Sequence, residues 1–214
     1  MSPEATDFLY PFIEGDERDS AALLTDLAAS ARAKATQSRE LRSTTLERSH
    51  PDLQRAGTAI AERLRGGGRV YTFGNGGSAT DAAGLAALFR APPWGRPLPA
   101  RSLVSDEAVL TALGNDVGFD LVFARQIIAH GRAGDIAVGI STSGSSSNLI
   151  AAFAEAARRR LLTVGVAGYD GGQMAQAGLD HCLVVEADSV HRIQETEAAV
   201  MFELWAIVQA HMGS

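Results

Sequence analysis

Short apolar runs alternate with helical patterns along most of the chain. Helical spacing of apolar residues predicts helices at 78–90, 107–113, 119–130 and 146–159, and a long last helix at 189–211. Between them, short apolar runs bounded by Gly-, Pro- or hydroxyl-rich turns predict five strands: Val70–Phe73, Arg101–Val104, Ile136–Ile140, Leu162–Val166 and Leu183–Val185. Buried strands that alternate with helices indicate the α/β class, with a parallel sheet covered by helices on both faces.

The N-terminal third has a different pattern. From Ser20 to Arg48 the chain is rich in Ala, Leu and Arg, and its interrupted apolar face predicts one long helix. Pro51 is expected to start a second helix, because proline is well tolerated in a first helical turn. Three consecutive glycines, 66–68, are expected to end it.

These patterns predict one α/β domain preceded by a helical extension. We place the extension at residues 1–50 and the domain at residues 51–214, and we find no internal repeat. Residues 1–19 are acidic, with an aromatic and aliphatic patch inside the acidic stretch. Such a segment is suited to contact a protein partner, so we name it as a possible docking segment.

Composition narrows the functional classes. The chain has 214 residues, of which 46% are hydrophobic and 21% charged, as expected for a globular protein. A net charge of −6 argues against direct nucleic-acid binding. The single cysteine, Cys182, lies in an apolar run and excludes an intrachain disulfide. Without a signal-peptide pattern or a membrane-length apolar run, we expect a cytoplasmic protein with no membrane contact.

Two small-residue turns follow predicted strands. "FGNGGSATD" follows the first strand and "GISTSGSSSN", residues 139–148, ends the third, and a helix begins directly after each turn. A helix N-terminus favours a phosphate, and hydroxyl groups donate to it without adding charge. The candidate hydroxyl donors are Ser141, Thr142, Ser143 and Ser146. The alternative is helix capping, but a cap requires one hydroxyl group rather than a run of them.

These turns differ from the common nucleotide-binding motifs. No lysine follows the glycines as in a Walker loop, and "GNGGS" lacks the spacing of a dinucleotide-binding turn. We therefore expect a phosphate monoester as ligand and no cofactor.

Five motifs in order carry a resemblance to a known family. "GNGGSATDAA", "LGNDVGF", "GISTSGSSSN", "GYDGGQMA" and "RIQE" resemble the sugar isomerase (SIS) domain proteins, and among them the phosphoheptose isomerases. The resemblance implies a flavodoxin-like, doubly wound, five-stranded parallel sheet, and homotetramers formed with the N-terminal helices. It also implies a phosphorylated sugar as ligand, bound by Asn75, Gly76, Ser78, Ser141, Thr142, Ser143 and Ser146, with Asp116 and Gln194 near the sugar hydroxyls.

The same resemblance reveals a departure from the family. Phosphoheptose isomerases carry a His and a Glu on the helix after the first turn, and Gln and His on the last helix, a set that can also bind zinc. Here Gly84, Leu88 and Phe202 stand at three of these positions, and only Gln194 is kept. None of the three replacements can transfer a proton or ligate a metal, so we expect neither the family mechanism nor its zinc.

Other ionisable groups could replace the missing ones. Glu195 and His191 lie four residues apart near the start of the last helix and are candidates for an acid–base pair. The competing interpretation is that Glu195 and Glu197 only favour the positive end of that helix, and that Asp81 caps or pairs locally.

Three functional hypotheses remain open. The first is a sugar-phosphate-binding protein without isomerase chemistry that acts as a sensor, a regulator or a subunit of a mixed assembly. The second is an active ketose–aldose phosphate isomerase with a substitute base such as Glu195. The third is shared catalysis, in which a paralogous subunit supplies the missing groups.

Overall fold

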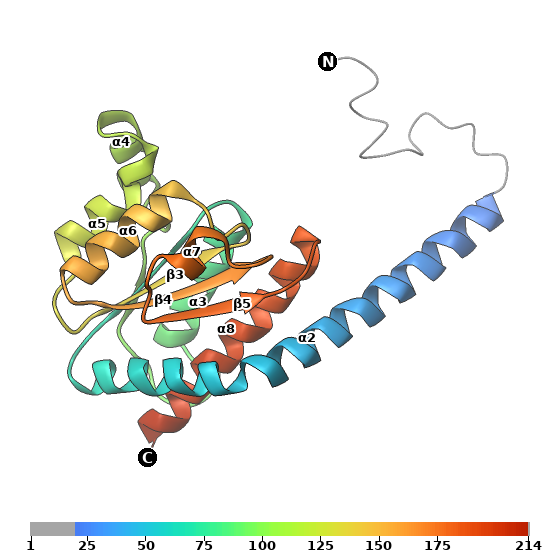
Figure 1. Ribbon diagram of the computed structural model, residues 1–214, viewed down its shortest axis with the longest axis horizontal. Helices are drawn as coiled ribbons and strands as arrows, with labels where there is room; N and C mark the ends of the chain where they lie inside the picture. Colours follow the sequence, from blue (N-terminus) through green and yellow to red (C-terminus); the bar gives the residue numbers. More distant parts are fainter. Residues whose placement is uncertain (1–19, 214) are drawn as a thin grey trace. The chain divides into compact units, whose positions relative to one another are not determined.

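The computed structural model describes residues 20–213 and has two compact units, residues 1–40 and 41–214. The described part of the first unit is helical and belongs to α2, Ser20–Arg65 (Figure 1). In this part Leu24 and Leu27 are exposed. No helix within residues 20–213 is long and apolar enough to cross a membrane.

The second unit is built around a parallel five-stranded sheet. The strands lie in the order β2-β1-β3-β4-β5, and every neighbouring pair is parallel. This order confirms the predicted flavodoxin-like, doubly wound topology. The strand bounds are β1 Val70–Gly74, β2 Ala100–Ser102, β3 Ile136–Ser141, β4 Leu162–Gly168 and β5 His181–Val185.

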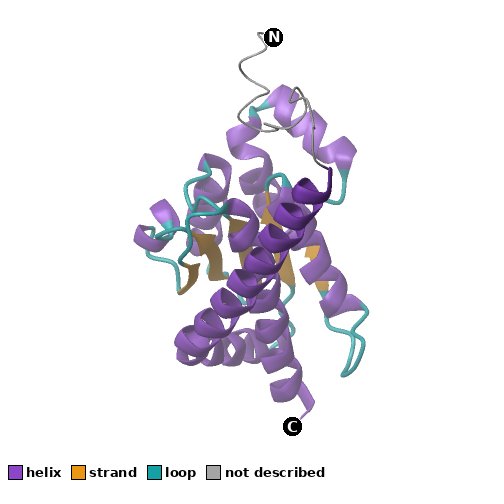
Figure 2. Ribbon diagram, turned by 90° about the vertical axis from the view of Figure 1, so that its right-hand side faces the viewer, coloured by secondary structure: helices purple, strands orange, loops and turns teal. Residues whose placement is uncertain are grey.

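Helices cover both faces of the sheet, as Figure 2 shows. One core lies between the sheet and α3, α8 and the C-terminal part of α2, and the other packs against α5, α6 and α7. The helix bounds are α3 Gly77–Arg90, α4 Glu107–Asp116, α5 Val122–His130, α6 Ser147–Arg158, α7 Gly172–Gln176 and α8 Val190–Gly213, with a 3-10 turn η1 at Phe119–Leu121.

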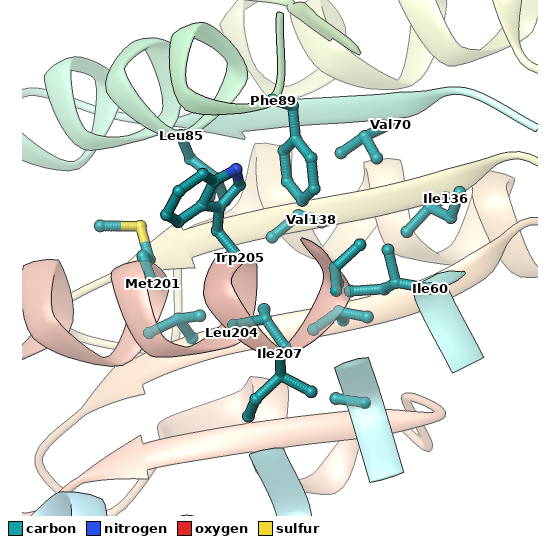
Figure 3. Packing of buried hydrophobic residues seen from close by; sticks show 14 of the residues in the cluster. Ile60, Val70, Leu85, Phe89, Ile136, Val138, Met201, Leu204, Trp205 and Ile207 are labelled. Carbon is teal, nitrogen blue, oxygen red and sulfur yellow. The ribbon is translucent and has the colours of Figure 1, made fainter. Parts of the chain in front are cut away.

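The first core is centred on an indole ring. Figure 3 shows Trp205 of α8 extending toward Leu85 and Phe89 of α3, and all three side chains are at most 2% exposed. Burial of a side chain of this size contributes about 2–3 kcal/mol, so these contacts hold α8 against α3. These contacts fix α8, which carries Gln194, to α3, which follows the first small-residue turn.

One expectation about helices was wrong, and one helix was not predicted. Pro51 does not start a second helix but lies inside the single helix α2. The helix continues because Leu53, Ala56 and Ile60 on its next turns are fully buried, and this burial outweighs the backbone hydrogen bond that proline cannot donate. The short helix α7 was not predicted, because glycines at its start conceal a segment of only five residues.

Candidate functional site

The two small-residue turns meet at the point where the sheet topology reverses. From β1 the chain runs to β2 on one side and then to β3 on the other, so the carboxyl ends of β1 and β3 form a switch point. Asn75 follows β1 and Asn148 lies in the first turn of α6. Their amides exchange two hydrogen bonds of 2.9 and 3.0 Å, which join the turns.

The turn after β3, which we call the hydroxyl turn (Ser141–Ser146), brings hydroxyl groups together. The Ser141 Oγ lies 3.3 Å from the Ser143 Oγ and 3.1 Å from the Ser146 Oγ. Ser146 occupies the N-cap position of α6, but its side chain makes no capping hydrogen bond. The Ser143 Oγ accepts the Ser145 backbone N–H at 3.3 Å. The Ser146 hydroxyl thus lies in the cluster without capping α6, which argues against simple capping. Thr142, also in this turn, is half-buried.

The turn after β1, which we call the glycine turn (Gly74–Gly77), opens onto a cavity. Gly76 has a φ of 56°, a left-handed conformation that glycine adopts without strain. Asn75 and Gly76 line a cavity of about 420 Å³ together with residues of α3, the segment after β2, and η1. Its size is in the range of small-molecule sites. Ser78 is 3% exposed and is not among the residues that line this cavity.

Gln194 of α8 packs against the glycine turn. A Cβ atom at Gly77 would lie 2.3 Å from the Gln194 Nε2, so only glycine permits this approach. The Gln194 side chain is half-buried, and its amide atoms are the three nearest to the position of a Gly77 Cβ.

Two carboxyl groups lie one helical turn further along the same helices. Asp81 follows Gly77 by four residues on α3, and Glu197 follows Gln194 by three on α8. Glu197 is fully buried, and neither of its oxygens has a hydrogen-bond partner. Burial, with a smaller contribution from the Asp81 carboxylate, raises the pKa of Glu197 to about 8. Burial also raises the pKa of Asp81.

Glu197 is the residue that sequence reasoning missed. Its carboxyl was expected only to favour the positive end of α8, and this interpretation did not anticipate that the side chain lies inside the core. A signal was present. Ile193, Val200 and Leu204 form an apolar stripe at helical spacing, and Glu197 is the charged residue within it.

The remaining candidates lie apart from the hydroxyl turn. Asp116 is exposed in the last turn of α4, and its carboxylate accepts a hydrogen bond from Asn115 at 2.9 Å. Glu195 is exposed and forms an ion pair with Arg192 at 2.7 Å, and His191 is exposed at the start of α8. No contact described for these three residues brings them to either turn.

The positions of the family's missing groups hold no acid, base or ligand. Gly84 is exposed, and a Cβ atom there would meet nothing within 4 Å. Leu88 packs against the first core, and Phe202 lies against Trp205 with a ring-centroid distance of 5.2 Å. Hydrogen and hydrocarbon side chains offer zinc no donor atom, so these residues do not fit the metal. Residues 20–213 contain no group of three His, Cys, Asp or Glu side chains arranged to hold an ion.

Comparisons with known proteins agree with this fold and with these motifs. Residues 35–168 match the SIS domain. The phosphoheptose isomerase of Rhodospirillum rubrum is 40% identical over 165 residues, which cover 74% of this chain and 85% of that protein. The solved phosphoheptose isomerase GmhA from Neisseria gonorrhoeae is 36% identical with a TM-score of 0.78, over 87% of this chain and 99% of that one.

A second solved phosphoheptose isomerase, from Francisella tularensis, is 29% identical with a TM-score of 0.81, over 86% of this chain and 98% of that one. Sequence and structure therefore agree over nearly the whole length of these relatives. The chain belongs to the SIS domain family, in the subgroup that resembles the phosphoheptose isomerases.

Proposed function

We propose that this chain binds a phosphorylated sugar at the two turns and does not isomerise it with the residues that the family uses. The observation that carries the proposal is the hydroxyl cluster of Ser141, Ser143 and Ser146, which the helix end does not use. Three hydroxyl donors at the start of α6, a helix end with partial positive charge, suit a phosphate dianion.

The sugar moiety would lie toward the glycine turn. The Asn75–Asn148 pair joins that turn to the hydroxyl turn, and the adjoining cavity of about 420 Å³ has room for a chain of carbons and hydroxyls. The Gln194 amide beside Gly77 is a donor and acceptor for a sugar hydroxyl. The relatives are named phosphoheptose isomerases, and the resemblance to this family suggests sedoheptulose 7-phosphate as the first compound to test.

The lack of isomerase chemistry rests on Gly84, Leu88 and Phe202. Moving a proton between adjacent carbons requires a group that changes protonation, and these residues have none. We infer a role as a sensor, a regulator or a subunit of a mixed assembly, without zinc or another cofactor.

The alternative is an active ketose–aldose phosphate isomerase with a substitute base. The half-buried Asp81 and the buried Glu197 favour it, because both carboxyl groups have raised pKa values, and they lie one helical turn beyond Gly77 and Gln194, respectively. Glu195, the base suggested by the sequence, is held by Arg192 and remains a weaker candidate, with His191 as its partner.

Assembly and location complete the proposal. The exposed Leu24 and Leu27 support a homotetramer formed through the N-terminal helices. The segment proposed to bind a protein partner, residues 1–19, lies outside the described residues. If the partner were a paralogous subunit, it could supply the missing catalytic groups. We expect a cytoplasmic protein without direct nucleic-acid contact.

The test combines binding and chemistry on one compound. Sedoheptulose 7-phosphate is titrated in a thermal-shift experiment, and deuterium exchange next to its carbonyl is followed by NMR in heavy water. We expect stabilisation without exchange. Ser143→Ala and Ser146→Ala should each weaken binding by about 1–3 kcal/mol, because each removes a hydrogen bond to a charged group.

Ser147→Ala is the matched control. Its hydroxyl lies next to the cluster in sequence but donates to Asp120 at 2.5 Å, so affinity should stay unchanged. Equal affinity in all three variants would refute the phosphate site. Exchange with turnover would instead establish the isomerase alternative, and Glu197→Gln and Glu195→Gln would then identify the base.

A further inference from the structure

A second cavity lies at the amino ends of the strands, whereas the two turns lie at their carboxyl ends. It has a volume of about 420 Å³ and is lined by residues before β1, between α5 and β3, and at the end of α6. Arg69 directly precedes β1 and Asp135 directly precedes β3. This amino-edge cavity is therefore separate from the carboxyl ends of the strands. Its chemically relevant lining residues are Arg69, Tyr71, His130, Arg132, Asp135 and Arg159.

The one carboxylate of the lining is engaged by the backbone. Asp135 is 7% exposed, and its two oxygens accept the backbone N–H groups of Arg69 and Arg132, each at 2.8 Å. The carboxylate thus holds these two arginines on the same rim. Their guanidinium groups form none of the ion pairs recorded for residues 20–213.

Further cationic groups lie on or beside the same cavity. Arg101 of β2 is the register partner of the lining residue Tyr71 but is not itself among the lining residues, and it forms none of the described ion pairs. Arg159 is paired with Glu155 at 2.5 Å, and Glu155 is shared with a second arginine. The cavity is therefore surrounded by an excess of positive charge in a chain whose net charge is −6.

Burial and the nearby arginines shift the pKa values of His130 and Tyr71. Burial and the guanidinium groups of Arg101 and Arg69 lower the pKa of His130. The Tyr71 hydroxyl donates a hydrogen bond to the His130 carbonyl at 3.0 Å. Burial and the Asp135 carboxylate raise the pKa of Tyr71, and the Arg69 guanidinium partly offsets this rise. Like charges this close repel one another, and a bound anion would relieve the repulsion.

We infer that the amino-edge cavity binds a small metabolite that carries two phosphoryl groups. Guanidinium groups match phosphate oxygens with paired, planar donors, and the lining residues Arg69 and Arg132 offer two such groups that form no described ion pair. Arg101 adds positive charge beside Tyr71 without lining the cavity itself. The volume exceeds the needs of a bare ion and suits a small organic molecule. The inference is independent of the proposed sugar-phosphate site, which lies at the other ends of the same strands.

Isothermal titration with inorganic pyrophosphate at low salt tests the site. We expect Arg69→Gln and Arg132→Gln each to weaken binding at least about tenfold, because each removes charged hydrogen bonds. Both side chains are exposed, so the variants should keep the circular dichroism spectrum and unfolding midpoint of the parent. Arg158→Gln, at the exposed end of α6 and outside the lining, is the matched control and should keep the parent affinity.

Ser146→Ala separates this site from the hydroxyl turn. The hydroxyl turn also suits a phosphate, so the arginine variants are titrated again in the Ser146→Ala background. We expect pyrophosphate binding that persists in Ser146→Ala and is weakened there by Arg69→Gln and Arg132→Gln, whereas loss of all binding in Ser146→Ala alone would overturn the inference. Absence of binding, or equal affinity in all variants, would also overturn it. ADP and fructose 1,6-bisphosphate then distinguish a nucleotide from a doubly phosphorylated sugar. If neither binds more tightly than pyrophosphate, the assignment to a metabolite is wrong.

Discussion

Replacing the buried carboxyl with an amide, Glu197→Gln, should change how the stability of the protein depends on pH. The side chain is fully buried without a hydrogen-bond partner, and burial together with Asp81 raises the pKa of Glu197 from 4.5 to about 8. Between these two values the folded chain keeps the proton and the unfolded chain releases it. The folded state binds more protons, so the free energy of unfolding falls as pH rises through this window.

The magnitude follows from linkage. One proton contributes a slope of about 1.4 kcal/mol per pH unit, so between about pH 5.5 and 7.5 the parent should lose about 3 kcal/mol through Glu197. The amide side chain of the variant does not titrate. The difference in unfolding free energy, variant minus parent, should therefore grow with pH across the window and level off above about pH 8.

Urea unfolding followed by circular dichroism at several pH values measures this difference. Protein concentration and ionic strength are kept constant, since an assembly makes stability depend on concentration. Glu62→Gln makes the same chemical change at an exposed carboxyl on α2 and is the control. A flat difference for Glu197→Gln would refute the reasoning, because it would mean that the buried group ionises near its ordinary pKa.

Three further predictions concern the helix, the junction of the turns and the metal. Pro51→Ala should raise the free energy of unfolding by about 1–3 kcal/mol, because alanine restores the hydrogen bond to the Glu47 carbonyl; an unchanged urea midpoint would contradict this. Asn148→Ala should lower the free energy of unfolding by about 1–3 kcal/mol, because the half-buried Asn75 amide loses its partner. The control Asn115→Ala, on exposed α4, should leave this free energy nearly unchanged. Adding EDTA should leave the thermal midpoint unchanged, and a lower midpoint would indicate a bound metal after all.

The central strands β1, β3 and β4 were predictable because every residue in them is buried. Parallel strands covered on both faces appear as continuous apolar runs, and β3 and β4 contain only buried residues. Their order was not contained in those runs and came from the resemblance. Helix ends were less certain at Pro51, because a local rule about proline competes with the burial of Leu53 and Ile60, which depends on the rest of the fold.

The site was predictable only as far as it is local. Ser141, Ser143 and Ser146 lie within one turn, so their sequence spacing was enough to suggest that their hydroxyls meet, as they do. Gln194 reached the glycine turn because Gly77 leaves room for it, a contact between two helices that periodicity does not reveal. The same argument explains why Asp116 and Glu195 could not be assigned from their types alone.

Glu197 illustrates the difference between placing a side chain and knowing its charge. The apolar stripe of Ile193, Val200 and Leu204 carried enough information to place residue 197 in the core, although the sequence analysis did not use it. Its protonation state depends first on burial and then on the carboxylate of Asp81, which belongs to a helix far away in the sequence. Among the described residues, no group forms a hydrogen bond with the Glu197 oxygens. A buried carboxyl without such a partner costs stability that an apolar residue would not. Since Glu197 lies one turn from Gln194, its pH-dependent stability and its effect on sugar-phosphate binding should be measured on the same variant.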